Sequence, residues 1–156
     1  MRILALLLFA LITTPALAQD WRAYDNARFD YRVDIPPGFR SLGESENGDG
    51  QGFINTRTPI ELLVWGGHLL DGFESEVAQR MAWSEADAWN ITYQAVTPRW
   101  ASYSAIKGSR VLYERLVLLC DGASYAAFRA GYSVTETADM NQPIERMVQS
   151  LRGNGC

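Results

Sequence analysis

The stretch from Trp100 to Tyr132 constrains the fold more strongly than any other part of the chain. Three runs rich in β-branched, aromatic and aliphatic residues are separated by Lys107-Gly108 and Asp121-Gly122. Each dipeptide puts a glycine where a tight hairpin requires positive φ, and Asp-Gly is among the strongest short-range hairpin signals. The sequence therefore predicts a three-stranded antiparallel meander at the centre of a sheet.

The first 18 residues are predicted to form a signal peptide. Arg2 precedes an unbroken apolar run at residues 3–12, and Ala16-Leu17-Ala18 places small residues where signal peptidase reads them. The apolar run is shorter than the ~20 residues that span a bilayer, although an uncleaved membrane anchor is the alternative. We expect cleavage before Gln19, a single domain over residues 19–156, no stable membrane anchor, and a periplasmic or secreted protein.

The formal net charge of −4 at pH 7 indicates the kind of partner that the chain can bind. Nucleic-acid recognition requires a basic face, and a modest acidic balance spread along the chain argues against it. The sequence therefore predicts no nucleic-acid partner. It favours an unknown protein or small molecule of the cell envelope.

Further strands are predicted from period-two alternation and from turn residues between the runs. They lie at residues 21–24, 29–35, 53–56, 60–65 and 89–96. The intervening residues 40–52 are polar and glycine-rich, and we predict that they form the longest loop.

Two helices are predicted from apolar side chains at helical spacing. The first covers residues 72–88, with Asp71 as N-cap and Glu74 completing a capping box. The second covers residues 142–152, with Pro143 in its first turn and Gly153 as its C-cap. This order predicts an α+β fold, in which a single antiparallel sheet of about six or seven strands is covered by the two helices.

Short motifs in the chain resemble those of two groups of proteins. The layout, together with the F-x-Y-x-V-x-I-P pattern at residues 29–36, resembles the α/β/α sandwich of the PsbP-like superfamily. Nearly the whole chain after residue 18 also resembles small uncharacterised secreted proteins of Gram-negative bacteria. The shared segments lie at residues 26–31, 47–50, 113–115 and 150–152. The first resemblance implies an accessory or binding protein rather than an enzyme, and it carries no functional residue over to this chain.

The only two cysteines are Cys120 and Cys156. An even number of cysteines in an oxidising compartment favours a disulfide, which would tie the C-terminus to the end of the sheet and contribute roughly 3–4 kcal/mol. The alternative is a buried free Cys120 and a frayed tail.

Catalytic candidates are few. His68 is the only histidine, and no serine or cysteine lies in a nucleophile motif. Glu61 and Glu114 lie on predicted strands and could face each other, as the paired carboxylates of a hydrolase do. An ion pair between Glu114 and an arginine on the sheet is the competing interpretation.

Metal and cofactor motifs are equally weak. Ser45-x-Asn47-x-Asp49-Gly50 partly matches a calcium loop, but Thr56 occupies the position that requires a glutamate. Glu44, Glu46 and Asp49 remain candidates for a weak cation, while a glycine-rich turn is the simpler interpretation. The sequence contains no dinucleotide, P-loop or Cys-x-x-Cys motif, and it predicts no cofactor.

Aromatic residues and the polar loop suggest binding. The side chains of Trp65, Trp89, Trp100, Tyr93 and Tyr103 could form a stacking platform for sugars or could pack in the core. Asn47, Asp49 and Gly50 lie in the predicted long loop, and such loops often carry recognition. We expect an exported, non-catalytic accessory or binding protein. The alternative is a small periplasmic hydrolase that uses carboxylates on the sheet.

Overall fold

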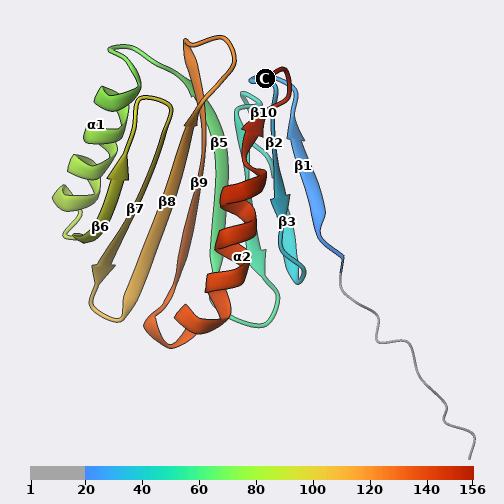
Figure 1. Ribbon diagram of the computed structural model, residues 1–156. Coiled ribbons are helices and arrows are strands. Elements are labelled where there is room, and N and C mark those ends of the chain that lie inside the picture. The colour runs from blue at the N-terminus through green and yellow to red at the C-terminus, as the bar shows by residue number, and fades with distance from the viewer. Residues whose placement is uncertain (1–19) are drawn as a thin grey trace, which may run out of the picture.

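The computed structural model describes residues 20–156 and has an α+β architecture with two sheets and two main helices (Figure 1). The signal peptide predicted for residues 1–18 lies outside the described residues. The N-terminal half contains β1 Arg22–Asn26, β2 Tyr31–Ile35, β3 Phe39–Glu44, β4 Gly50–Asn55, β5 Glu61–His68 and α1 Phe73–Ala86. The C-terminal half contains β6 Asn90–Val96, β7 Trp100–Lys107, β8 Arg110–Leu118, β9 Ser124–Ser133, a 3-10 turn at Val134–Glu136, α2 Thr137–Ser150 and β10 Arg152–Gly153.

The main sheet has seven antiparallel strands in the order β3-β4-β5-β9-β8-β7-β6. The predicted meander is confirmed as β7-β8-β9. Lys107 pairs with Arg110 across the first turn, and Leu118 pairs with Tyr125 across the second. Gly108 and Gly122 have φ values of 59° and 67°, the left-handed conformation for which glycine is suited.

A second, three-stranded sheet has the order β1-β2-β10, so the expectation of a single sheet is wrong in this respect. Both edges of β2 are occupied, by β1 and by the two-residue strand β10. The small sheet packs face to face on the main sheet, because β2 shares one core with β5 and β9. Tyr31, Val33 and Ile35 of β2 are 0–1% exposed between the two sheets.

The main sheet has two differently covered faces because successive residues of a strand point to opposite sides. Phe128 of β9 packs in a core with β2 and with Met147 of α2. Ala127 of β9 packs in a separate core with Val77 of α1 and Tyr103 of β7. We call these faces the α2 side and the α1 side.

The long loop predicted at residues 40–52 is wrong, because this segment forms the β3–β4 hairpin. Two of its glycines have identifiable structural roles, one in close packing and one at a bulge. A Cβ on Gly50 would lie 2.0 Å from the Val64 carbonyl oxygen, and Gly43, with φ of 99°, lies at a bulge. Glycine inside a strand marks a bulge or a close backbone approach, which composition alone does not separate from a loop.

Both predicted helices exist, but their ends differ from the prediction. The N-cap of α1 is Gly72, without a side-chain hydrogen bond, so the capping box of Asp71 and Glu74 is absent. The start of α2 lies at Thr137, and Pro143 sits inside the helix rather than in its first turn. A capping box of Ser133 and Glu136 precedes it.

The chain end returns to the fold instead of capping a helix. Gly153 belongs to β10, where an added Cβ would lie 2.6 Å from Cys120 Sγ. Cys120 is paired with Cys156, and the two Cα atoms are 5.6 Å apart, a separation compatible with a disulfide. None of the helices in residues 20–156 is long and apolar enough to cross a membrane.

Candidate functional site

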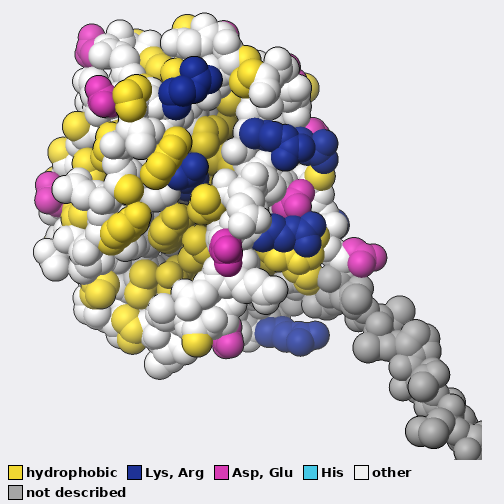
Figure 2. Space-filling view, in the orientation of Figure 1, with side chains coloured by type: hydrophobic (Ala, Val, Ile, Leu, Met, Phe, Trp, Pro, Cys, Tyr) yellow, Lys and Arg dark blue, Asp and Glu magenta, His cyan; other side chains and the backbone are white. Residues whose placement is uncertain are grey.

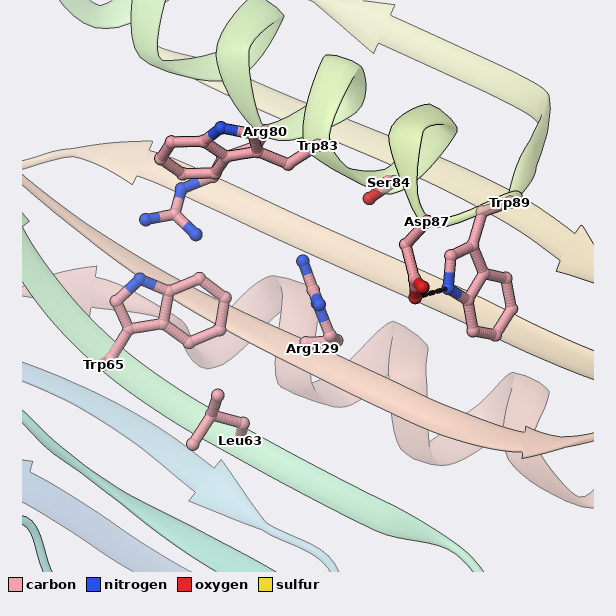
Figure 3. Close-up of a pocket in the computed structure, with 8 residues that line it drawn as sticks. All are labelled: Leu63, Trp65, Arg80, Trp83, Ser84, Asp87, Trp89 and Arg129. Carbon is pink, nitrogen blue, oxygen red and sulfur yellow. Dashed lines mark hydrogen bonds between the residues drawn. The ribbon is translucent and has the colours of Figure 1, made fainter.

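The α1 side of the main sheet contains a hollow that the helix does not cover. It has a volume of about 360 Å³. The side chains around it come from β5, α1, the turn after α1, and β9 (Figure 3). They are Leu63, Trp65, Arg80, Trp83, Ser84, Asp87, Trp89 and Arg129. We call this hollow the tryptophan groove.

The periodicities of the strand and the helix direct these side chains into the tryptophan groove. Leu63 and Trp65 are alternate residues of β5, so both lie on the α1 side. Arg80, Trp83 and Ser84 follow at helical spacings of three and four and share one face of α1. The groove is apolar at its rim, where Leu63 is 47% and Trp83 56% exposed.

The turn after α1 places the third tryptophan. Ala88 has a φ of 61°, which reverses the chain, and the Trp89 amide donates to the Ser84 carbonyl at 3.0 Å. The Trp89 indole N–H donates to Asp87 Oδ2 at 3.2 Å (Figure 3). Lys107 donates to Asp87 Oδ1 at 3.2 Å, and this hydrogen bond and its charge lower the pKa of Asp87.

An ion pair between a buried glutamate and a partly exposed arginine underlies the groove. Glu114 of β8 is 0% exposed, and its Oε2 accepts from Arg129 Nε at 2.6 Å. Its Oε1 has no hydrogen-bond partner in residues 20–156, although Arg80 Nη1 lies 3.8 Å away. Burial lowers the pKa of Arg129, but the charge and hydrogen bond of Glu114 together with those of Tyr103 outweigh it, and the pKa is raised. Arg129 therefore remains a cation beside the Glu114 carboxylate.

Arg80 occupies an aromatic enclosure at the edge of the groove. Its guanidinium carbon lies 4.8 Å from the Trp65 ring centroid, 5.1 Å from that of Tyr125 and 5.9 Å from that of Trp83. It also donates from Nε to Glu76 Oε1 at 2.8 Å and to the Tyr125 hydroxyl. Arg80 and Arg129 are thus each matched by a carboxylate, and the cations around the groove are balanced within the protein.

The hollow continues along the sheet. A second hollow of about 430 Å³ shares Leu63, Asp87, Trp89 and Arg129 with the groove and extends over β4 and β5. A third hollow, of about 340 Å³, lies between Trp65 and the β3–β4 turn. Asp49 and Gly50 line this third hollow, but Asn47 does not, so part of the predicted recognition loop borders the groove.

The three hydrolase candidates are not brought together. Glu61 and His68 begin and end β5, about 23 Å apart at the rise of an extended strand. Glu61 and Glu114 both lie on the α1 side, but β9 separates their strands, and Arg129 binds Glu114 from that strand. The His68 ring instead contacts Phe29 and hydrogen-bonds through Nδ1 with Ser124 Oγ at 3.1 Å.

Two of the three cation candidates already accept hydrogen bonds from side chains in or near the β3–β4 turn. Asp49 accepts from Ser45 Oγ at 2.6 Å and from Asn47 Nδ2 at 2.9 Å. Glu44 accepts from the Tyr24 hydroxyl at 2.6 Å, while Glu46 is exposed. Residues 20–156 contain no group of three potential ligands that could hold a metal ion. The turn accordingly has the geometry of a self-bonded hairpin loop.

The five aromatic residues predicted to form one platform lie in three different places. Trp65 and Trp89 line the groove, whereas Tyr103 is 0% exposed in the α1-side core. Tyr93 and Trp100 lie on the α2 side. The sequence reasoning missed Trp83, Arg80 and Arg129. The Arg80-x-x-Trp83 spacing on a helix was available as a signal, but the place of Arg129 depends on strand register.

Comparisons with known proteins identify the fold. No family model matches the sequence, and no curated protein matches it. The architecture is similar to that of solved structures that include cyanobacterial PsbP from Synechocystis and the Ran-binding protein Mog1p from Saccharomyces cerevisiae. It is also similar to that of LpqN, involved in cell envelope biogenesis, from Mycobacterium tuberculosis.

The similarity extends over most of each chain at low sequence identity. For PsbP the TM-score is 0.64 at 10% identity, covering 88% of this chain and 95% of that one. For Mog1p the TM-score is 0.63 at 10% identity, with 86% and 95% covered. For LpqN the TM-score is 0.54 at 16% identity, with 78% and 82% covered. The predicted PsbP-like fold is confirmed, and this resemblance concerns the fold alone.

Proposed function

We propose that this chain is an exported, non-catalytic binding protein whose tryptophan groove takes a neutral sugar. The observation that carries the proposal is the combination of three tryptophans around an open hollow with ion pairs that are already matched. Exposed aromatic surface is retained where a ligand covers it. A sugar ring offers an apolar C–H face for an indole and hydroxyls for planar polar groups such as those of Arg129 and Asp87.

The charge balance separates this ligand class from anions. Arg129 is bound by Glu114, Arg80 by Glu76, and Asp87 by Lys107. A phosphate or carboxylate ligand would have to compete with these carboxylates for the arginines. A neutral ligand can accept hydrogen bonds from donors that remain free without separating any pair.

The non-catalytic and exported parts of the proposal have separate support. Glu114, the carboxylate beneath the groove, is buried and ion-paired, while Glu61 and His68 lie at opposite ends of β5. Export is supported by the signal-peptide pattern at residues 1–18 and by the paired cysteines. Among structural neighbours, Mog1p is described as Ran-binding and LpqN as involved in envelope biogenesis, which fits a binding role in the envelope.

The test is a titration of intrinsic tryptophan fluorescence with soluble chito-, cello-, malto- and xylo-oligosaccharides. We expect at least one to bind, and Trp83→Ala to weaken that binding at least tenfold. Trp21→Ala is the matched control, since Trp21 lies under Arg146 away from the groove. The proposal would be refuted if none of the four oligosaccharide series bound. It would also be refuted if Trp83→Ala and Trp21→Ala lost the same affinity. Chromatography of the incubated sugars checks for cleavage, which would favour the hydrolase alternative.

A further inference from the structure

The α2 side of the main sheet is only partly covered. Helix α2 packs with β2 and β9 and does not lie over β6, β7 and β8, although Tyr113 of β8 contacts the edge of the α2-side core (Figure 1). Hydrophobic side chains gather over these strands on the face shown in Figure 2. Tyr93, Trp100 and Ile106 are 53%, 38% and 39% exposed. Together with Tyr113 and Arg115 they define what we call the β6–β8 face.

Strand register places these side chains on one side. Ser102 pairs with Arg115, and Ser104 pairs with both Tyr113 and Tyr93. Residues directly opposite each other in an antiparallel sheet project to the same face. Their neighbours Tyr103 and Glu114 project to the α1 side, where the first is buried in the core and the second underlies the groove. The β6–β8 face is therefore separate from the tryptophan groove.

Arg115 lies within this aromatic surface without a counter-ion. Its guanidinium carbon lies 4.4 Å from the Trp100 ring centroid, and its Nη1 donates to Ser102 Oγ at 3.1 Å. No carboxylate in residues 20–156 forms an ion pair with it, and its buried Nε has no hydrogen-bond partner there. Burial also lowers the pKa of Arg115. An unpaired, partly desolvated cation among aromatic rings is costly unless an anion completes it.

The charge on this face disfavours two occupants, a second copy of the chain and the chain's own N-terminal segment. A symmetric dimer through the β6–β8 face would bring two Arg115 side chains together, because both copies present the same patch. Residues 1–19 contain no aspartate or glutamate, so that segment brings no carboxylate to the face. We therefore take the complementary carboxylate to belong to another protein.

The backbone of the face indicates the form of the partner. The hydrogen bonds of β7 and β8 are used within the sheet, so an extended segment lying on the face would leave its own amides and carbonyls unpaired. A helix satisfies its backbone internally. Three strands at a spacing of about 4.8 Å make a surface roughly 14 Å wide, which matches a helix ~10–12 Å in diameter.

We propose that the β6–β8 face binds an amphipathic helix of a partner protein, whose apolar stripe covers Tyr93 and Trp100 and whose carboxylate pairs with Arg115. This mode resembles the way amphipathic helices dock in apolar grooves elsewhere. The carboxylate supplies specificity, since a helix with a neutral or basic residue at that position leaves Arg115 buried and unpaired.

The experiment selects binders from a display library of three-helix bundles randomised on one helix face, using the full-length protein purified after export. We expect the selected helices to be enriched in a single Asp or Glu flanked by apolar residues. A double-mutant cycle then combines Arg115→Gln with Glu→Gln in the binder. Each single change should weaken binding at least tenfold, and the double change should cost little more than either.

Two further variants keep the result interpretable. Tyr93→Ala removes an exposed side chain, so the variant should fold normally, and it should also weaken binding. Arg57→Gln changes a residue of the exposed β4–β5 turn and should leave binding unchanged. Helices without acidic enrichment, or equal affinity for Arg115→Gln and the wild type, would overturn the proposal. So would sedimentation showing that the protein dimerises through Tyr93 and Trp100, because the occupant would then be a second copy.

Discussion

At the scale of single residues, buried ionisable groups decide how stability responds to pH and to substitution. Tyr103 is 0% exposed beside Glu114, and burial together with the negative charge raises the pKa of its hydroxyl to about 12. Unfolding returns this pKa to its usual value of about 10. The unfolded chain therefore loses the Tyr103 proton at a lower pH than the folded chain does.

Replacing Tyr103 by phenylalanine should reduce the loss of stability in alkali. Tyr103 contributes its full stabilisation below about pH 10 and loses it as the pH rises toward 12, at about 1.4 kcal/mol per pH unit. Urea unfolding at several pH values from 8 to 11.5 measures this, and Tyr103→Phe should show a shallower slope above pH 10. Tyr93→Phe, an exposed control, should follow the wild type. Parallel slopes for all three proteins would contradict the assignment.

Removing Arg129 should be more harmful than removing the whole ion pair. Arg129→Met leaves the Glu114 carboxylate buried beside only Arg80, which lies 3.8 Å away and compensates in part. We expect the free energy of unfolding to fall by about 3 kcal/mol, since an uncompensated buried charge is costly. The double variant Glu114→Leu with Arg129→Met should recover part of that loss. Urea denaturation measures both, and a double variant weaker than Arg129→Met would contradict this account.

At the scale of elements, the β3–β4 hairpin depends on a glycine that packs against a neighbouring strand. A Cβ at Gly50 would lie 2.0 Å from the Val64 carbonyl oxygen, which is backbone and cannot move without disturbing the sheet. Gly50→Ala should therefore cost about 3 kcal/mol or more, within the range of overpacking and strain. Gly52→Ala is a matched control in the same strand, because its Cβ would meet the flexible Leu42 side chain at 3.3 Å. Thermal unfolding distinguishes the two, and equal melting temperatures would count against the packing argument.

The capping box at Ser133 begins the 3-10 turn that leads into α2, and we expect it to help fix the start of that helix. Its hydroxyl accepts from the Thr135 amide, and Glu136 accepts from the Ser133 amide at 2.8 Å. Ser133→Ala should lower the free energy of unfolding by about 1 kcal/mol through loss of the cap. Amide hydrogen exchange over residues 134–139 should rise more than exchange at the other end of α2. Uniform exchange along the helix would show that tertiary packing alone sets its start.

What the sequence predicts well is local periodicity, and what it misses depends on contacts between distant segments. The meander, both helices and the α+β class follow from turn glycines and apolar spacing. The hairpin at residues 39–55 was missed because Gly50 and Gly43 resemble loop residues until Val64 and the bulge are known. Trp65 and Trp89 can be named as candidates from residue type alone. The position of Arg129 beside them cannot, because it depends on strand register. Only the pairing of β8 with β9 brings it to Glu114.

At the scale of the whole molecule, the two faces of one sheet carry the two binding surfaces that we propose. On the α1 side every cation of the tryptophan groove is matched by a carboxylate, which favours a neutral ligand. On the α2 side Arg115 is unmatched, which favours an acidic partner. Both surfaces arise because α1 and α2 each cover only part of a seven-stranded sheet. Binding at either face can therefore be tested without altering the other.

The C-terminal segment connects the main sheet to the small sheet through a disulfide and through β10. Removing the disulfide should therefore lower the stability of the whole molecule. Cys156 is paired with Cys120 at the end of the meander, across a sequence separation of 36, while β10 between them pairs with β2 of the small sheet. In the chain-entropy treatment, closing a loop of this size stabilises the folded state by about 4 kcal/mol. Cys120→Ser with Cys156→Ser should lower the free energy of unfolding by roughly this amount.

Urea unfolding of the exported protein, with and without reductant, measures the loss. The reductant should destabilise the wild type and leave the double variant unchanged. The intact mass of the wild type should be two units below that of the reduced chain, with an N-terminus at Gln19. A free-thiol mass would show that the two cysteines remain unpaired after export. In that case β10 would depend on its two pairs with β2 alone.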